Sequence, residues 1–360
     1  MVVQRQPLRA ELIRAEFRQI CGIRLVEQTF SARIYFEFLF PDANIIPGIA
    51  GGSEDAPLNP DGTRKGLRFY TESISWMNAI EPPSVLTDKL TPDKDSIRWA
   101  LEVQGTFLEK FECNDFPFDT QALSVSIEFA MSNEGPFPMD LSIDLADACD
   151  VNAKHFVWDS EYDLGTRTKL VTDVRRVLQT RSYPDLTFSC YVRRRPFFYT
   201  INIVLPNMLL ALLAGLQFFI PVEDVAGRAS VSMTLLLVCA SYFHYSGSLT
   251  PTVGYLTLID THALWCMSVV ISMVFWVGVV RSSESEDLEY IDKMALYGFM
   301  VIWLLIQIVF VLRFSFAWSK ASAELDVPAV LGGAEAREKL LTVNSRSRFD
   351  RTSVKGYDAL

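Results

Sequence analysis

Residues 229–249 read ASVSMTLLLVCASYFHYSGSL, a run without Asp, Glu, Lys or Arg. A bilayer core about 30 Å thick needs roughly 20 helical residues at about 1.5 Å each, so this run is long enough to cross a membrane. Further uncharged runs lie at residues 197–220, 261–280 and 294–312. We therefore predict four membrane-spanning helices, at about 197–220, 229–249, 258–280 and 294–316.

The polar side chains of the run 229–249 share one face. At about 100° per residue they fall within an arc of roughly 80°, which contains one large apolar residue, Leu237. The polar members of this face are Ser230, Thr234, Ser241, His244 and Ser248. Hydroxyls gain nothing from lipid, so the face is expected to meet water or a partner helix.

Two interpretations of this polar face stay open from the residues alone. A ring of such helices would enclose a hydroxyl-lined path with one leucine constriction, which can gate by dewetting. The hydroxyls could instead bond to carbonyls of their own helix or hold helices together. A lone histidine such as His244 is more often a satisfied helix residue than a proton sensor.

The first half of the chain has the composition of a β domain. Strand-like runs recur between clusters of Pro, Gly, Asn and Asp, at residues 23–40, 67–77, 97–111, 121–131, 139–145, 156–178 and 186–192. This pattern predicts an immunoglobulin-like β-sandwich. Before it, Pro7, the apolar residues Leu8, Leu12, Ile13, Phe17 and Ile20, and Gly22 predict a short amphipathic helix.

These patterns divide the chain into three parts. We predict a β-sandwich over residues 1–195, with a long surface loop at Pro41–Gly66, and a helical membrane domain over residues 196–317. The remaining residues, 318–360, are polar and mixed in charge, and their composition predicts partial disorder.

Charge and motifs exclude several functions. A net charge of −10 argues against nucleic-acid binding, which needs a basic surface. The six cysteines form no C-x-x-C pair, and the three histidines form no motif with metal ligands or a nucleophile. We therefore expect no enzyme, no metal and no cofactor. Transport would require intramembrane charges or broken repeated halves, which the sequence lacks.

Several ordered motifs resemble the pentameric ligand-gated ion channel superfamily, which contains the acetylcholine and glycine receptors. Phe116-Pro117-Phe118-Asp119-x-Gln121 resembles the loop at the base of that family's sandwich. Arg194-Arg195-Pro196, followed by Pro206 and Pro221, resembles its first membrane helix. Arg228 and, 23 residues later, Pro251, with Tyr255, Thr257 and Asp260, resembles its pore helix and the following loop.

The resemblance implies a homopentamer around a central pore in the plasma or inner membrane, with the N-terminal domain outside. The partners would be four identical subunits, the lipid bilayer, permeating inorganic ions and an agonist. Leu108 and Ala122 stand at the positions of the family's loop cysteines, so that disulfide is absent. The chain therefore resembles a bacterial-type member.

In this family an agonist binds between neighbouring subunits in a box of aromatic residues. Carried over by position, the residues implied for the box are Tyr35, Phe129 and Tyr183, with Glu81 and Glu128 as sources of negative charge. The box is incomplete, because Pro82 and Pro83 occupy a place where another aromatic is common. A small amine or protons are the expected agonists. Each of these aromatics, taken alone, is more often a core residue than a ligand contact.

Coupling between the two domains is expected at the base of the sandwich. The resemblance implies that Phe116, Pro117, Phe118 and Asp119 meet the loop at 249–255, which contains Pro251. Arg194 is expected to pair with Asp119 or Glu27.

The residues that would set ion selectivity are Glu223, Asp224, Gly227 and Arg228. Gly227 replaces the glutamate that usually precedes the pore arginine in cation channels, while Ala226-Gly227 replaces the Pro-Ala of the anion type. Acidic rings from Glu223 and Asp224 favour cations. The alternatives are an anion-selective channel or a four-span sensor that binds ligand without conducting.

Overall fold

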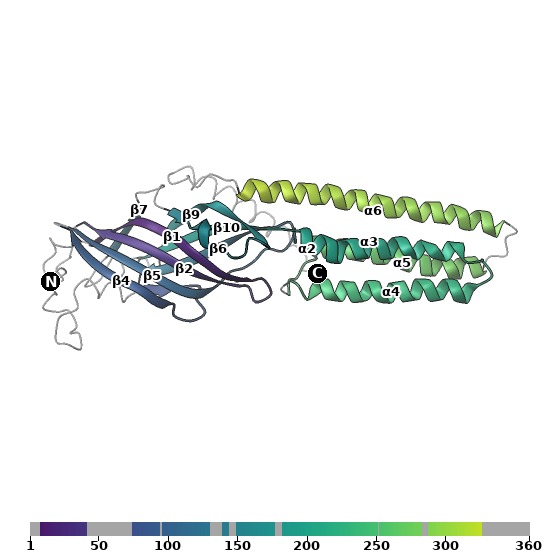
Figure 1. Cartoon of the computed structure of the whole chain (residues 1–360), viewed down its shortest axis with the longest axis horizontal. Coiled ribbons are helices and arrows are strands. Elements are labelled where there is room, and N and C mark those ends of the chain that lie inside the picture. Colours follow the sequence, from purple (N-terminus) through teal and green to yellow (C-terminus); the bar gives the residue numbers. More distant parts are fainter. Residues whose placement is uncertain are drawn as a thin grey trace, which may run out of the picture.

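The computed structural model describes residues 8–41, 74–93, 96–129, 139–143, 149–176, 182–250, 252–282 and 287–325. All strands lie in one half of an elongated molecule, and the long helices run side by side in the other half (Figure 1). The chain thus forms a two-sheet β-sandwich followed by four long apolar helices.

The larger sheet has the strand order β4-β5-β2-β1-β7, with β8 also paired to β1. Its strands are β1 (Leu8–Arg24), β2 (Thr29–Phe40), β4 (Ser84–Asp93), β5 (Ser96–Leu108), β7 (Met139–Ile143) and β8 (Cys149–Val151). The smaller sheet has the order β3-β6-β10-β9. Its strands are β3 (Ile74–Trp76), β6 (Thr120–Phe129), β9 (Tyr162–Arg176) and β10 (Ser182–Arg194).

An aromatic core joins the two sheets. Buried and half-buried residues alternate along β2 and β6, as expected of strands with one face on a core. Phe17 of β1 stacks on Phe188 of β10 with ring centroids 4.6 Å apart. Phe38 of β2 meets Phe129 of β6 edge to face at 5.6 Å.

The predicted amphipathic helix near the N-terminus is wrong, because these residues form β1. Its register against β2 shifts after Leu12, Phe17 and Ile20. Each shift inserts an extra residue, so the buried apolar positions are Ala10, Leu12, Ala15, Phe17, Ile20 and Ile23. Bulges therefore turn a spacing of two into an occasional spacing of three, which imitates helical periodicity.

Two further differences concern the strands. The predicted run 23–40 contains a turn at residues 25–28, where Gln28 has a φ of 54°, so it belongs to two strands of a hairpin. Strands β4 and β8 were not predicted, since β4 is largely exposed and polar and β8 has only three residues. The predicted loop after Pro41 and most of the run 67–77 lie outside the described residues.

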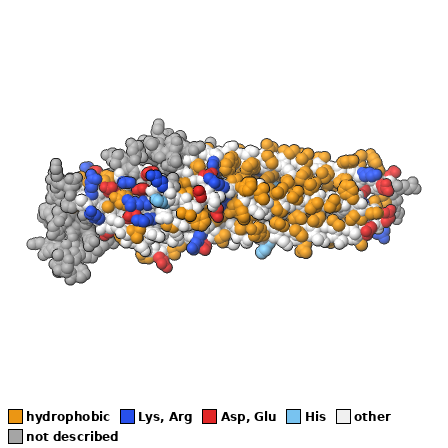
Figure 2. Space-filling model, in the orientation of Figure 1, with side chains coloured by type: hydrophobic (Ala, Val, Ile, Leu, Met, Phe, Trp, Pro, Cys, Tyr) orange, Lys and Arg blue, Asp and Glu red, His pale blue; other side chains and the backbone are white. Residues whose placement is uncertain are grey.

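Four helices are long and apolar enough to span a membrane: Phe197–Phe219, Val225–Gly247, Leu258–Ser282 and Leu288–Leu325. The last three are α4, α5 and α6, and the first is built from α2 (Phe197–Tyr199), η2 (Thr200–Val204), α3 (Leu205–Leu213) and η3 (Ala214–Phe219). On the face shown in Figure 2, apolar side chains cover most of the helical half, and charged side chains gather at its two ends.

The fourth helix is longer than predicted. It begins at Leu288 rather than near residue 294 and continues to Leu325, past the predicted end at residue 316. Residues 318–325 are therefore helical, which corrects the expected disorder for that stretch. The physical reason is that this extension packs on the sandwich, where Ala317 and Ala321 are buried. Residues 326–360 lie outside the described part.

Candidate functional site: the exposed face of α4 and the domain junction

The polar face of α4 points away from the rest of the chain. Every predicted member is exposed: Ser230, Thr234, Leu237, Ser241, His244 and Ser248. The buried residues of the same helix lie on its other side: Arg228, Ser232, Cys239 and Ser246. Ser232, for example, donates a hydrogen bond to Oε1 of Gln217 at 2.5 Å. This chain therefore leaves the polar face of α4 uncovered.

Hydroxyls on this face also bond to their own helix. Thr234 donates to the carbonyl of Ser230 at 2.8 Å, and Ser241 donates to the carbonyl of Leu237 at 3.0 Å. Such a bond uses the hydroxyl proton but leaves lone pairs on the oxygen. The face therefore presents oxygen acceptors outward, which suits cations, and back-bonding and an aqueous path are compatible.

Leu237 interrupts this polar face. With 69 % of its surface exposed, it is the most exposed large apolar residue on α4. Its neighbours on the stripe, Thr234 and Ser241, are polar. An apolar group at this place would form the narrow dry ring that dewetting needs if copies of α4 faced one another.

The N-terminal cap of α4 explains why a glycine stands at position 227. Asp224 is the N-cap residue, and its Oδ1 accepts a hydrogen bond from the backbone N–H of Gly227 at 2.9 Å. A Cβ on Gly227 would collide with the Asp224 carboxylate. Gly227 therefore leaves room for the Asp224 cap. The side chains of Glu223 and Asp224 both face solvent.

The side chain of Arg228 lies inside the helical bundle. It is 2 % exposed and donates to both carboxylate oxygens of Asp292 on α6, at 3.0 and 2.8 Å. It also donates to the carbonyl of Ile220 at 2.7 Å, and Trp276 on α5 donates to Asp292 at 3.0 Å. Arg228 was predicted to take part in ion selectivity, and within this chain its hydrogen-bond partners hold the side chain inside the bundle, away from the exposed face.

A second buried ion pair lies where the sandwich meets the helices. Arg194, at the end of β10, donates from Nε to Oδ1 of Asp119 at 3.0 Å, and both side chains are at most 3 % exposed. Arg194 also donates to the hydroxyl of Tyr162 at 2.8 Å. Gln121 donates to the other oxygen of Asp119. Of the two predicted partners, Arg194 therefore uses Asp119.

Glu27, the other predicted partner, lies in the β1–β2 turn. It pairs with Arg24 at 3.0 Å, and both side chains are more than half exposed. Solvent screens such a pair, so it adds little stability. Glu27 is thus not part of the buried junction within one chain.

Burial raises the pKa values of two groups at the junction between the sandwich and the helices. Burial raises the pKa of Tyr162 to about 12, although the charge of Arg194 acts against this shift. Burial also raises the pKa of the Cys113 thiol to about 11, and Asp119 adds to the rise. Both groups therefore stay protonated at neutral pH, and all six cysteines are free.

The Phe116-Pro117-Phe118 segment contacts two helices, α2 and α6. Phe116 meets Tyr199 of α2 edge to face at 4.8 Å, and Phe118 packs on Phe314 of α6 at 4.4 Å. Close by, the N–H of Cys113 donates to the hydroxyl of Tyr255 at 2.9 Å. Pro117 is buried. Pro251 lies outside the described residues.

The end of α6 adds a contact that sequence reasoning missed. Arg193 lies over the ring of Trp318 at 4.4 Å and donates to the hydroxyl of Ser322 at 2.8 Å. Lys320 pairs with Asp115 at 3.0 Å. The small residues Ala317 and Ala321, four positions apart, are a helical signal for this packing, but the polar composition around them predicted a tail.

Comparisons with known proteins agree with this architecture. The chain is 24 % identical over 223 residues to neuronal acetylcholine receptor subunit alpha-3 of Bos taurus, covering 61 % of this chain and 39 % of that subunit. It is 26 % identical over 233 residues to subunit beta-4 of Gallus gallus, covering 60 % and 47 %. It is 24 % identical over 309 residues to subunit alpha-3 of Mus musculus, covering 84 % and 54 %.

The chain is a distant homologue of acetylcholine receptor subunits. It spans about half the length of these curated relatives or less. No family model matches it. With its four apolar helices after an N-terminal domain, this receptor homologue is a multi-pass membrane protein.

The residues implied for an agonist box lie on both sheets of the receptor homologue. Tyr183 on β10 and Glu128 on β6 are half-buried in the smaller sheet, and Glu81 is exposed before β4. Tyr35 lies on β2 of the larger sheet. Phe129 is fully buried against Phe38, so the prediction that it faces a ligand is wrong. Alternation along β6 turns this ring into the core.

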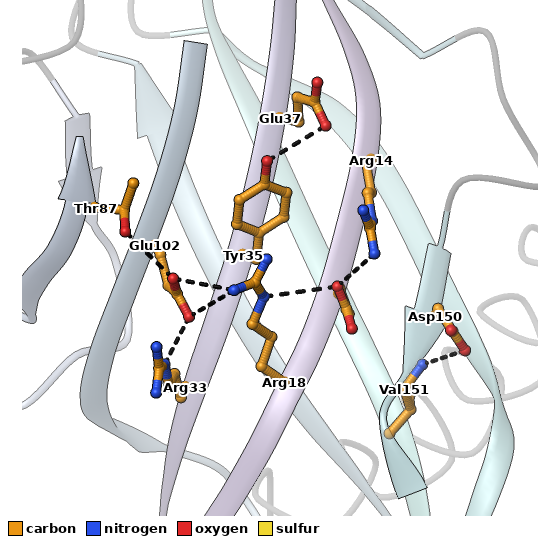
Figure 3. A network of polar contacts seen from close by, with 10 residues as sticks. Arg14, Arg18, Arg33, Tyr35, Glu37, Thr87, Glu102, Asp150 and Val151 are labelled. Carbon is orange, nitrogen blue, oxygen red and sulfur yellow. Dashed lines mark hydrogen bonds and ion pairs between the residues drawn. The ribbon is translucent and has the colours of Figure 1, made fainter. Parts of the chain in front are cut away.

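Tyr35 lies in a network of charged side chains on the outer face of the larger sheet (Figure 3). The guanidinium of Arg18 stacks over its ring at 4.3 Å, and its hydroxyl donates to Glu37 at 3.4 Å. Arg18 and Arg33 both donate to Glu102, at 3.2 and 2.6 Å. One face of the ring is therefore already occupied by a cation of the same chain.

The charge network makes the stability of the sandwich depend on pH. Burial by itself raises the pKa of Glu102, but hydrogen bonds and charges from Arg33 and Arg18 outweigh it, so the pKa is lowered from 4.5. A lowered folded-state pKa adds stability above the unfolded value, and this stability is lost as pH falls through the folded value.

We expect the thermal midpoint of the sandwich to fall as pH drops below about 4.5. Glu102→Gln should lower the midpoint at pH 7 and flatten its dependence between pH 6 and pH 3. Glu81→Gln, at an exposed position, is the matched control and should keep the wild-type slope. Equal slopes for all three proteins, measured by circular dichroism melts, would contradict this prediction.

Proposed function

We propose that this protein is a ligand-gated ion channel in which five identical chains surround a pore lined by the exposed face of α4. The observation that supports this most is a row of exposed polar side chains on a helix apolar enough to span a membrane, interrupted by Leu237. Lipid cannot satisfy such a face, whereas a ring of copies encloses it in water.

The sandwich is proposed to lie outside the cell and to bind the agonist between neighbouring chains. Tyr183 and Glu128 on the smaller sheet of one chain would then face Tyr35 on the larger sheet of its neighbour, with Glu81 in the loop before β4 as a further acid. A small amine suits the two acids, and protons are the second candidate. Arg18 over Tyr35 weighs against that ring as the cation's contact and favours Tyr183.

Binding is proposed to reach the pore through the junction. Asp119 and Arg194 are one buried pair, and the adjacent Phe118 touches α6 while Cys113 bonds to the loop after α4. A movement of the sandwich would therefore pull on the helices at several points, because packed contacts transmit shifts. The exposed acids Glu223 and Asp224 and the hydroxyl oxygens of α4 favour cations.

Recording from purified protein in planar bilayers tests this function. With a salt gradient across the membrane, amines and a pH series from 4 to 8 are applied to the sandwich side. We expect agonist-dependent currents that reverse near the cation potential. Reversal near the chloride potential would favour the anion-selective alternative, and folded pentamers without current under every condition would favour a non-conducting sensor.

Neutralising the inner acids should weaken cation preference. We expect the double variant Glu223→Gln, Asp224→Asn to shift the reversal potential toward the chloride value, because asparagine still caps α4 while the negative ring is lost. Glu289→Gln removes an exposed acid from α6 and should change it less. An unshifted reversal potential in the double variant would contradict the role of these acids.

A further inference from the structure

A buried charge pair holds the inner ends of the helices together. Arg228 on α4 and Asp292 on α6 share two hydrogen bonds, while Trp276 on α5 and the carbonyl of Ile220 supply the remaining contacts. Both charged side chains are at most 6 % exposed. Four segments therefore meet at one pair of charges.

Asp292 is unusual on its helix. From Leu288 to Met300 it is the one buried residue, while Ile291, Lys293 and Met294 beside it are exposed. Hydrophobic residues of similar volume often stabilise a buried site as well as an ion pair does. Anchoring α6 therefore does not require a carboxylate, and the charge calls for another explanation.

The position of Arg228 supplies that explanation. Arg228 lies within the first turn of α4, and the diameter of a helix with its side chains is about 10 Å, so its guanidinium is about that far from the exposed face. Glu223 and Asp224 lie immediately before this helix. The distance to the exposed face is about one Debye length at 0.1 M salt, so an uncompensated guanidinium there would act on ions at the mouth. A released arginine would also extend toward water.

We propose that Asp292 is a specificity-determining residue, which neutralises Arg228 and holds it on the bundle side of α4, so that Glu223 and Asp224 alone set the charge of the inner mouth. Asp292 acts through Arg228 and is a positioning residue. This inference rests on the proposed channel function. It predicts that the fourth helix, which does not carry the proposed pore face, contributes to ion selectivity.

Reversal potentials of Asp292→Asn test the inference. The amide keeps the size and one acceptor for Arg228 but loses the charge, so the ratio of chloride to sodium permeability should rise about threefold or more. Glu289→Gln removes an equal charge from the exposed side of α6 and should leave the ratio near the wild-type value. The Arg228→Gln, Asp292→Asn double variant removes both charges and should also keep the wild-type ratio.

The outcomes separate this inference from the channel function. Wild-type protein without current removes both. If the wild type conducts and Asp292→Asn keeps its reversal potential, the inference alone fails. It also fails if the double variant shifts as much as Asp292→Asn, since Arg228 would then not be the cause. If Asp292→Asn does not assemble, the double variant tests the inference instead. A chloride-to-sodium permeability ratio that differs from the wild-type value in the double variant would contradict it, because removing a neutral pair should leave the charge of the mouth unchanged.

Discussion

Asp119→Ala is expected to destabilise the protein by about 3–5 kcal/mol, because it leaves the guanidinium of Arg194 buried without its counter-charge. Arg194 would keep Tyr162 and the faces of nearby rings, but a hydroxyl and aromatic faces do not replace a carboxylate. Proteins have a total stability of only about 5–15 kcal/mol, so this loss is a large fraction of the total and should lower the thermal midpoint clearly. Size-exclusion chromatography after a heating series measures this loss.

Lys320→Ala is the matched control for this junction. It breaks the ion pair with Asp115 a short distance away, but Lys320 is about half exposed and solvent screens the pair. Such surface pairs contribute about 0–1 kcal/mol, so the thermal midpoint should stay close to the wild-type value. Equal midpoints for Asp119→Ala and wild type would contradict the assigned role of the buried pair.

Asp119→Asn separates coupling from folding. The amide retains the shape of the side chain and an acceptor for Arg194, so more folded protein should be recovered than with alanine. We expect the agonist dose response of the surviving channels to shift at matched surface expression. A wild-type dose response would remove Asp119 from the coupling route and leave it a structural residue.

In the proposed channel, Leu237→Ser is expected to permit current without agonist. The change replaces the large apolar residue on the polar face with a hydroxyl, so the constriction would stay wet and lose its barrier. We expect a standing current in the absence of agonist. The agonist concentration for half-maximal current should fall at least about tenfold, because the free energy of the closed state relative to the open state rises by more than about 1.4 kcal/mol. Planar-bilayer recording measures both quantities.

Leu236→Ser provides the control for the gate. Leu236 is half-buried and packs against the inner cluster of the bundle rather than on the exposed face. The same chemical change should therefore lower thermal stability without a standing current. Leak of equal size from both variants would show general loosening of the helices and would remove Leu237 as the gate.

Local patterns were sufficient where one period governs a segment. The uncharged runs predicted four spanning helices because about 20 apolar residues have few other stable arrangements. The arc on α4 predicted one shared polar face because helical geometry converts spacing directly into direction. By contrast, β1 was predicted as a helix, since its bulges are set by pairing with β2 and leave an ambiguous spacing.

Partners across long distances were the part that sequence could not supply. Nothing near Arg228 points to Asp292, which lies 64 residues away, and nothing near Tyr35 points to Arg18 above its ring. Phe129 could be matched to a ligand position, but only the stacked sheets show that its ring faces Phe38. The choice between Asp119 and Glu27 as the ion-pair partner of Arg194 likewise required knowing which of the two side chains is buried.

By itself, the sequence determined that this protein has a β-rich half, four apolar helices and a polar stripe on the second, because hydrophobic and polar periodicity are local properties. Only the tertiary structure decided that the stripe is left uncovered, that Arg228 faces the bundle and that Arg194 is buried on Asp119. Those are questions of which charges lose water together, and the free energy of burying a charge depends on partners that folding brings from elsewhere in the chain.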